Sequence, residues 1–170
     1  MIAFGHTAIG SLIGLGGYEL FKNQSPIIGM VTTGSLGVVS HYIADFIPHG
    51  HLFKHNEYGK RIIWAILFDF LLSFGLFIYV AYQNFGFDLK FWYIFFGIGG
   101  SNLPDVLDGL IYIKFLPKIG LIKLENDFHQ STHWHAIWKR GKLIDGLPLG
   151  KRDIWQLTMV CLALLILIFH

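Results

Sequence analysis

Three stretches of the chain each carry a pair of histidine or aspartate residues at helical spacing. The pairs are His41 with Asp45, Asp105 with Asp108, and His129 with His133. Residues three or four positions apart lie on one face of a helix, so each pair presents its two side chains together. Imidazole and carboxylate groups form a donor set for zinc, manganese or iron. The spacing therefore predicts a metal site assembled from segments that are far apart in the sequence.

Two further histidines extend this donor set. His6 lies near the N-terminus, and His51 lies three residues after Pro48. The candidate metal ligands are then His6, His41, Asp45, His51, Asp105, Asp108, His129 and His133. These are too many for one tetrahedral ion, so we expect two divalent ions. Zinc is the first expectation, with manganese and iron as alternatives.

Two metal ions a few ångström apart can hold the attacking and leaving oxygens of a phosphoester during hydrolysis. We expect Asp108 to bridge the ions or to act as the general base. Lys139 and Arg140, in the long basic loop, are the expected contacts to the substrate phosphate. A lipid phosphoester is one candidate substrate, because the site would open at the level of the lipid headgroups.

These residues also have purely structural interpretations. His41 and Asp45 can form a hydrogen-bonded pair that joins two helices, and Asp105 can mark a helix start after Pro104. The two histidines of the third pair can lie on a solvated amphipathic stretch. Ionisable residues inside a membrane span are costly and usually functional, which favours ligands over hydrogen-bonded pairs. The sequence leaves four roles open: those of His49, His55, Asp69 and His135.

The elements that carry these residues are apolar segments of about membrane-spanning length. A span needs about 20 mostly apolar residues. We expect five spans: Ala3–Leu20, Pro26–Ile47, Ile62–Phe85, Phe91–Phe115 and Ile154–Phe169. Charged residues make up 14% of the chain and apolar residues 54%, whereas an average soluble domain has about 25% charged residues. The sequence thus predicts one domain over residues 1–170, an all-α integral membrane bundle with a long loop between its last two spans.

Small residues at helical spacing occur in two of these segments. Gly10 with Gly14, and Gly97 with Ser101, predict close packing between helices. The single cysteine, Cys161, excludes a disulfide within the chain and a thiolate metal cluster. The first segment lacks a basic residue before it and a clear cleavage pattern, so we expect it to be retained as a helix.

Lysine and arginine are concentrated in two loops. Eleven of the 13 basic residues lie between the second and third segments or between the fourth and fifth. With five spans, these loops share a side with the N-terminus, and the positive-inside rule makes that side cytoplasmic. Eight of the nine histidines map to the same side. We therefore expect a multi-pass protein of the inner membrane, whose net charge of +2 reflects topology and does not indicate nucleic-acid binding.

Four motifs carry a resemblance to a known family: GHTAIG, SHYIADFIPHGH, NLPDVLDG and HQSTHWH. Together they resemble the bacterial membrane-bound metal-dependent hydrolases, also called LexA-binding, inner-membrane-associated hydrolases. The matching positions are His6, His41, Asp45, Pro104, Asp105, Asp108, His129, Thr132 and His133. The resemblance implies a membrane-embedded metal-dependent hydrolase. The order of the motifs and two spacings differ from the family pattern.

A more distant likeness is to zinc-dependent phospholipase C. In that family a helix carries histidine, then aspartate four residues on, then histidine ten residues after the first. His41, Asp45 and His51 follow this spacing, and the resemblance implies that they bind zinc.

Metal-dependent hydrolysis is therefore the expected function, and a non-catalytic metal-binding membrane protein, such as a transporter or sensor, is the alternative. A transporter should place its ligands near the middle of the membrane, with polar residues leading to both faces. Here the candidate ligands gather on one face, which favours the enzyme. A structural scaffold would leave the carboxylates beside the histidines unexplained.

Overall fold

A computed structural model describes residues 3–47, 60–132, 137–139, 142–145 and 154–169. Six helices and one hairpin occur there: α1 (Ala3–Phe21), α2 (Pro26–Phe46), α3 (Lys60–Phe85), α4 (Leu89–Tyr112), α5 (Gly120–Thr132), β1 (Ile137–Lys139), β2 (Lys142–Asp145) and α6 (Ile154–Phe169). Each of the five apolar segments expected from the sequence coincides with one of the helices. The all-α class is confirmed, apart from the short antiparallel hairpin of β1 and β2.

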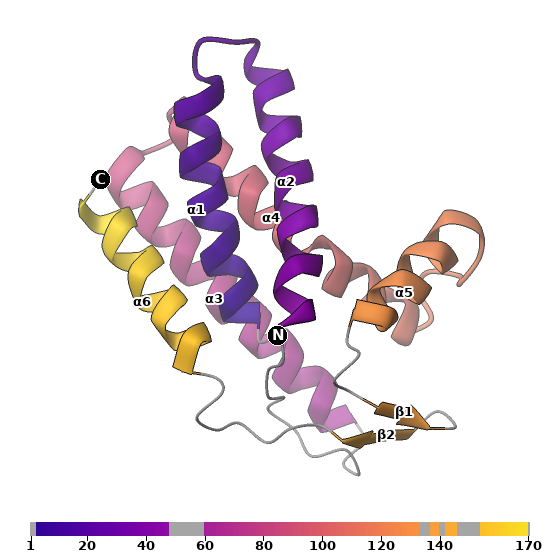
Figure 1. The fold of residues 1–170 in the computed structure, drawn as a ribbon. Helices are drawn as coiled ribbons and strands as arrows, with labels where there is room; N and C mark the ends of the chain where they lie inside the picture. The colour runs from indigo at the N-terminus through magenta and orange to yellow at the C-terminus, as the bar shows by residue number, and fades with distance from the viewer. Residues whose placement is uncertain (1–2, 48–59, 133–136, 140–141, 146–153, 170) are drawn as a thin grey trace.

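The long helices α1 to α4 run alternately up and down in one bundle (Figure 1). The start of α1, the end of α2 and the end of α4 therefore lie at the same end of the bundle, and α5 lies beside that end. Local sequence fixes where the helices begin. Pro26 occupies the first turn of α2, and the Asp88 carboxylate caps α4 by accepting a hydrogen bond from the backbone N–H of Phe91 at 2.9 Å.

The expectation of five membrane spans is not met. Among the described helices, two are long and apolar enough to cross a membrane, Pro26–Phe46 and Leu67–Phe85. The apolar helix α6 has 16 residues and is shorter than a span requires. Glycine and polar residues lower the hydropathy of α1 and α4, because these helices use small residues for packing and polar residues for the site described below.

Most apolar side chains of the two candidate spans point away from the bundle. Only 28% and 17% of the residues in their most apolar stretches are buried. In α2 the side chains of Ile27, Val31 and Ile43 are exposed, as are those of Phe68 and Leu71 in α3. A core helix of a soluble protein would bury such residues. The two helices therefore present an apolar outer surface of the kind that lipid covers.

Helices α1, α2 and α4 approach one another through glycine. A Cβ atom at Gly97 would lie 2.3 Å from the carbonyl oxygen of Gly10, and one at Gly100 would lie 2.0 Å from that of Gly34. Neither distance leaves room for a side chain, so backbone lies directly against backbone. The close packing expected from Gly10, Gly97 and Ser101 is confirmed, since a Cβ at Gly10 would meet the Ser101 Oγ at 2.2 Å.

The core lies between α1, α3, α4 and α6. Its largest fully buried apolar side chains include Phe77, Ile94, Ile98 and Leu167. Beyond this apolar cluster, towards the end of the bundle that holds the N-terminus, the buried residues of α1, α2 and α4 become polar. The fold thus brings polar side chains from several helices together at one end of an otherwise apolar bundle.

Candidate metal centre

Five residues from four helices converge at the end of the bundle. His6 comes from the first turn of α1, His41 and Asp45 from the last two turns of α2, Asp105 from α4, and His129 from α5. His6, His41, Asp45 and His129 are between 0% and 2% exposed, whereas the Asp105 side chain is 36% exposed. The cluster is therefore buried on all sides except at Asp105.

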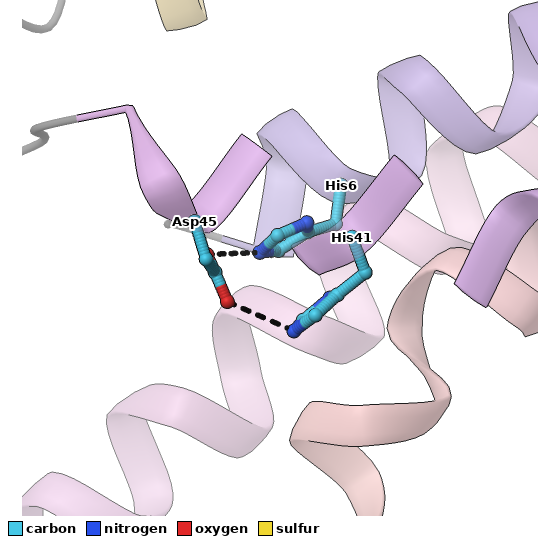
Figure 2. Close-up of side chains that lie close together, drawn as sticks. All are labelled: His6, His41 and Asp45. Atoms are coloured by element: carbon cyan, nitrogen blue, oxygen red, sulfur yellow. Dashed lines mark ion pairs between the residues drawn. The ribbon is translucent and has the colours of Figure 1, made fainter. Parts of the chain in front are cut away.

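The Asp45 carboxylate contacts three imidazoles. Its Oδ2 atom lies 3.0 Å from Nε2 of His41 and 3.1 Å from Nε2 of His129. Its Oδ1 atom lies 3.3 Å from Nε2 of His6. Figure 2 shows the two oxygens pointing to different histidines, which themselves lie side by side. The rings of His6 and His41 are stacked, with centroids 3.9 Å apart.

Asp105 repeats this division from the opposite helix. Its Oδ1 atom lies 3.6 Å from Nε2 of His129 and 3.9 Å from Nε2 of His41. Its Oδ2 atom lies 3.7 Å from Nε2 of His6. Each carboxylate thus directs one oxygen towards His6 and the other towards the pair of His41 and His129. Carboxylates that bridge two metal ions divide their oxygens in this way.

The orientation of His41 is fixed by the backbone of α4. Its Nδ1 atom lies 2.8 Å from the carbonyl oxygen of Ser101. A carbonyl oxygen only accepts hydrogen bonds, so Nδ1 carries the proton and donates it. In the neutral ring, Nε2 then presents its lone pair to the cluster. This is the arrangement by which proteins orient a metal-binding histidine.

His129 forms an ion pair with Asp108 on the side of the ring away from the cluster. Its Nδ1 atom lies 3.1 Å from Oδ2 of Asp108. Asp108 also accepts hydrogen bonds from the side-chain amides of Asn126 and Gln130, the latter at 2.7 Å. Burial lowers the pKa of His129, but Asp108 and Asp45 outweigh burial and raise it to about 10. Without a metal ion, the two carboxylates therefore keep the His129 ring doubly protonated and positively charged near neutral pH.

The His6 ring has both nitrogens buried, and neither forms a hydrogen bond within the part of the chain that the structure describes. Its Nε2 atom faces the two carboxylates at 3.3 and 3.7 Å. A buried imidazole usually hydrogen-bonds through at least one nitrogen, because an unsatisfied polar atom costs about 1–3 kcal/mol. A cation between His6 and the carboxylates would satisfy this nitrogen.

Buried polar contacts hold the helices that carry the cluster. The Ser101 hydroxyl donates a hydrogen bond to the carbonyl oxygen of His6 at 2.7 Å, which ties α4 to α1. The Asn102 amide donates to Thr7 Oγ1 at 3.1 Å and reinforces this link. The Tyr42 hydroxyl donates to Oε1 of Glu125 at 3.0 Å, which ties α2 to α5.

Of the eight expected ligands, five lie in the cluster: His6, His41, Asp45, Asp105 and His129. Asp108 contacts the outer nitrogen of His129 instead of the cluster interior. His51, His133 and Arg140 lie outside the described residues, as do His49, His55 and His135 and the side chain of Lys139. Asp69 accepts a hydrogen bond from the backbone N–H of Ala3 at 3.0 Å. Asp69 therefore supports the start of α1, one turn before His6.

Three contributors were not expected from the sequence: the Ser101 carbonyl, Asn126 and Gln130. Asn126 and Gln130 are four residues apart in α5 and share a face with His129. This polar spacing was a usable signal in the sequence, whereas a contact made by a backbone carbonyl, such as that of Ser101, leaves no signal there.

Comparison of the chain with protein-family models, with curated proteins and with solved structures found no match.

Proposed function

We propose that this protein is a membrane-embedded, metal-dependent phosphoester hydrolase. The observation that carries the proposal is the meeting of two histidine Nε2 atoms, from His41 and His129, at 2.9 Å beside Asp45. Because each ring has an acceptor beside Nδ1, both Nε2 atoms are directed at the same place. A positive charge is needed between these two nitrogens and the two carboxylates, supplied by a proton on His129 when metal is absent and by a metal ion in this proposal.

The distances support a tetrahedral position between His41, His129, Asp45 and Asp105. Four donors placed about 2.1 Å from a zinc ion lie about 3.4 Å apart. The separations from the two histidine Nε2 atoms to each other and to the carboxylate oxygens run from 2.9 Å to 3.9 Å. His6 and the second oxygens of both aspartates form another donor group at 3.3 and 3.7 Å. His41, His129, Asp45 and Asp105 would hold one ion, and His6 with the second carboxylate oxygens would hold another.

A divalent cation held here supplies Lewis-acid stabilisation of phosphoester oxygens and lowers the pKa of a water molecule. Asp105 is the exposed edge of the cluster, so the substrate phosphate approaches from its side. Asp108 forms an ion pair at Nδ1 of His129 and orients the ring, which makes it a positioning residue in this proposal. Lys139 and Arg140 remain the proposed phosphate contacts.

The location in a membrane rests on α2 and α3, whose lengths and outward apolar side chains suit lipid. Both helices have one terminus at the end of the bundle that carries the cluster (Figure 1). The site would thus lie at headgroup depth, where a lipid phosphoester can reach it. The lysine and arginine residues that follow α2 and α4 in the sequence favour the cytoplasmic side of the inner membrane in this proposal.

Metal content after mild purification tests the proposal. Wild type should retain stoichiometric zinc, manganese or iron, and Asp45→Asn should lose it because one carboxylate oxygen becomes an amide nitrogen and the other loses its negative charge. Asp127→Asn is the matched control, since Asp127 is exposed on α5 and pairs with Lys118 away from the cluster. Loss of metal in both variants, or its absence from wild type, would refute the site. The metal-loaded protein should cleave a phosphodiester, a phosphomonoester or a phospholipid.

A second candidate function is metal binding without catalysis, as in a sensor. The nearly complete burial of His6, His41, Asp45 and His129 favours it, because structural metal sites are closed. The two functions differ in one measurement. If metal is stoichiometric but none of the three phosphoester classes is cleaved, the second candidate replaces the first.

A further inference from the structure

Helix α5 packs with its polar residues inward and its apolar residues outward. Its buried residues are all polar: Asn126, His129 and Thr132. Its outer face consists of Leu121, Leu124 and Phe128, which are 82%, 66% and 51% exposed. These three residues share one side of the helix, because they are three and four positions apart. An amphipathic helix on a soluble protein has the opposite arrangement, with its apolar side buried.

The segment that leads into α5 continues this pattern. Ile113, Phe115 and Ile119 are 52%, 73% and 65% exposed. Lys114 turns the chain there with a φ of 60°, a left-handed conformation that ends α4. Six large apolar side chains are thus exposed within 16 residues, which exceeds the scattered single residues found on ordinary surfaces.

The contacts between α5 and the end of α2 determine the depth that α5 would have in a membrane crossed by α2. His129 of α5 contacts Asp45, which is in the last turn of the candidate span Pro26–Phe46. The Tyr42 hydroxyl, one turn earlier, donates to Glu125 of α5. If α2 crosses the membrane, α5 therefore lies where the span ends, at the boundary between hydrocarbon and headgroups. Figure 1 shows α5 beside this end of α2.

The charges around the outer face are mainly positive. Lys114, Lys118 and Lys123 are exposed, and Asp127, at 2.8 Å from Lys118, is the exposed acid among them. Glu125 is half-buried and accepts the hydrogen bond from Tyr42. A face of large apolar residues flanked by lysines matches a membrane surface that contains anionic lipid.

We propose that α5 is an interfacial helix whose outer face inserts among the headgroups of anionic lipids. This inference rests on the membrane location in the proposed function and extends it to a specific surface. It also narrows the substrate class. Because His129 is on the inward side of the same helix, lipid that contacts α5 lies next to the metal centre, which favours a phospholipid over a soluble phosphoester.

Site-directed spin labelling of the full-length protein in lipid vesicles tests this inference. Single cysteines are introduced at Leu124, at Asp127 and at Val39 in a Cys161→Ser background. Leu124 samples the outer face, Asp127 is its water-facing control on the same helix, and Val39 is an exposed residue of α2. Collision rates with oxygen, which partitions into lipid, and with a water-soluble nickel complex report the depth of each label.

The Leu124 label should favour oxygen and lie about 5–10 Å below the headgroup boundary, while the Asp127 label favours nickel. Replacing phosphatidylglycerol by phosphatidylcholine, or introducing Lys114→Glu with Lys123→Glu, should shift the Leu124 label towards water. A Leu124 label that stays in lipid after these changes would overturn the role of anionic lipid.

Two other results would overturn the inference itself. A Leu124 label in water, or one shielded from both reagents because a protein covers it, contradicts lipid insertion of α5. The Val39 label separates these failures from a failure of the proposed function. If Val39 lies in lipid and Leu124 does not, only the inference on α5 is wrong, whereas labels in water at both positions refute the membrane location.

Discussion

The Nε2 atom of His41 lies 2.9 Å from the Nε2 atom of His129. Two such atoms approach this closely only when a proton or a metal ion lies between them, because two lone pairs repel. The Ser101 carbonyl holds the proton of His41 on Nδ1, and Asp108 faces Nδ1 of His129. The protein thus directs both rings at one point, which Asp45 and Asp105 surround with negative charge.

Removal of metal should destabilise the protein. A ligand that binds only the folded state contributes about 2.7 kcal/mol when its free concentration is 100 times its Kd. We therefore expect a chelator to lower the unfolding temperature in detergent and zinc or manganese to restore it. Asp45→Asn should abolish the response, because it alters the carboxylate that contacts all three histidines. If neither the chelator nor added metal changes the unfolding temperature, the proposal that this cluster binds a metal is wrong.

Asp108→Asn should weaken metal binding without abolishing it. Partners that orient a metal-binding histidine typically contribute 10–100-fold in affinity, about 1.4–2.7 kcal/mol. A titration with a fluorescent zinc competitor measures this change, and the stoichiometry should remain that of wild type. Complete loss of metal from Asp108→Asn would instead make Asp108 a direct ligand. Asp127→Asn serves again as the unaffected control.

Adjacent glycines in α4 should respond oppositely to alanine. A Cβ at Gly100 would lie 2.0 Å from the carbonyl oxygen of Gly34, whereas a Cβ at Gly99 meets no atom within 4 Å. Gly100→Ala should lower the free energy of unfolding by about 1–3 kcal/mol through overpacking. Gly99→Ala should be neutral or stabilising by up to about 1 kcal/mol, through helix propensity. Denaturation in detergent measures both, and equal effects would refute backbone contact between α2 and α4.

Tyr42→Phe should loosen α5. The hydroxyl donates to the half-buried Glu125 carboxylate at 3.0 Å, and loss of a donor to such an acceptor costs about 1–3 kcal/mol. Hydrogen exchange of the α5 amides should accelerate relative to wild type, while the amides of α1 and α4 keep their rates. Tyr79→Phe, at an exposed position of α3, is the control. Unchanged exchange in Tyr42→Phe would mean that this bond does not hold α5.

Helical periodicity was enough to predict the bundle and much of the site. The spacing of His41 and Asp45 required one helix face, and the five apolar segments predicted α1 to α4 and α6. The distribution of lysine and arginine predicted that the start of α1 and the end of α2 lie on the same side. This prediction put His6 near His41 and Asp45. These features depend on residue spacing within one helix, over about 20 residues, or on the alternating up and down direction of consecutive helices. Both can be read from the sequence.

The parts that were not predicted depend on tertiary contacts. Helix α5 was expected as a loop because its apolar residues face outward, so its pattern resembles neither a span nor a core helix. Asp108 shares a face with Asp105, but its contact with the outer nitrogen of His129 follows only from the position of α5. The number of spans was overpredicted because α1 and α4 are not apolar enough along their length and α6, with 16 residues, is too short.

The cluster draws its donors from residue 6 to residue 129, and this range constrains how the protein is made. During synthesis, the histidine and the carboxylate of α2 emerge long before His129 completes the donor set. Among the described residues, the first 119 supply His6, His41, Asp45 and Asp105 to the cluster, and the proposed tetrahedral position is one donor short until α5 has emerged and docked. If the cluster binds a metal as proposed, firm capture is a late event in biogenesis, and a bound ion would report that four helices have assembled correctly.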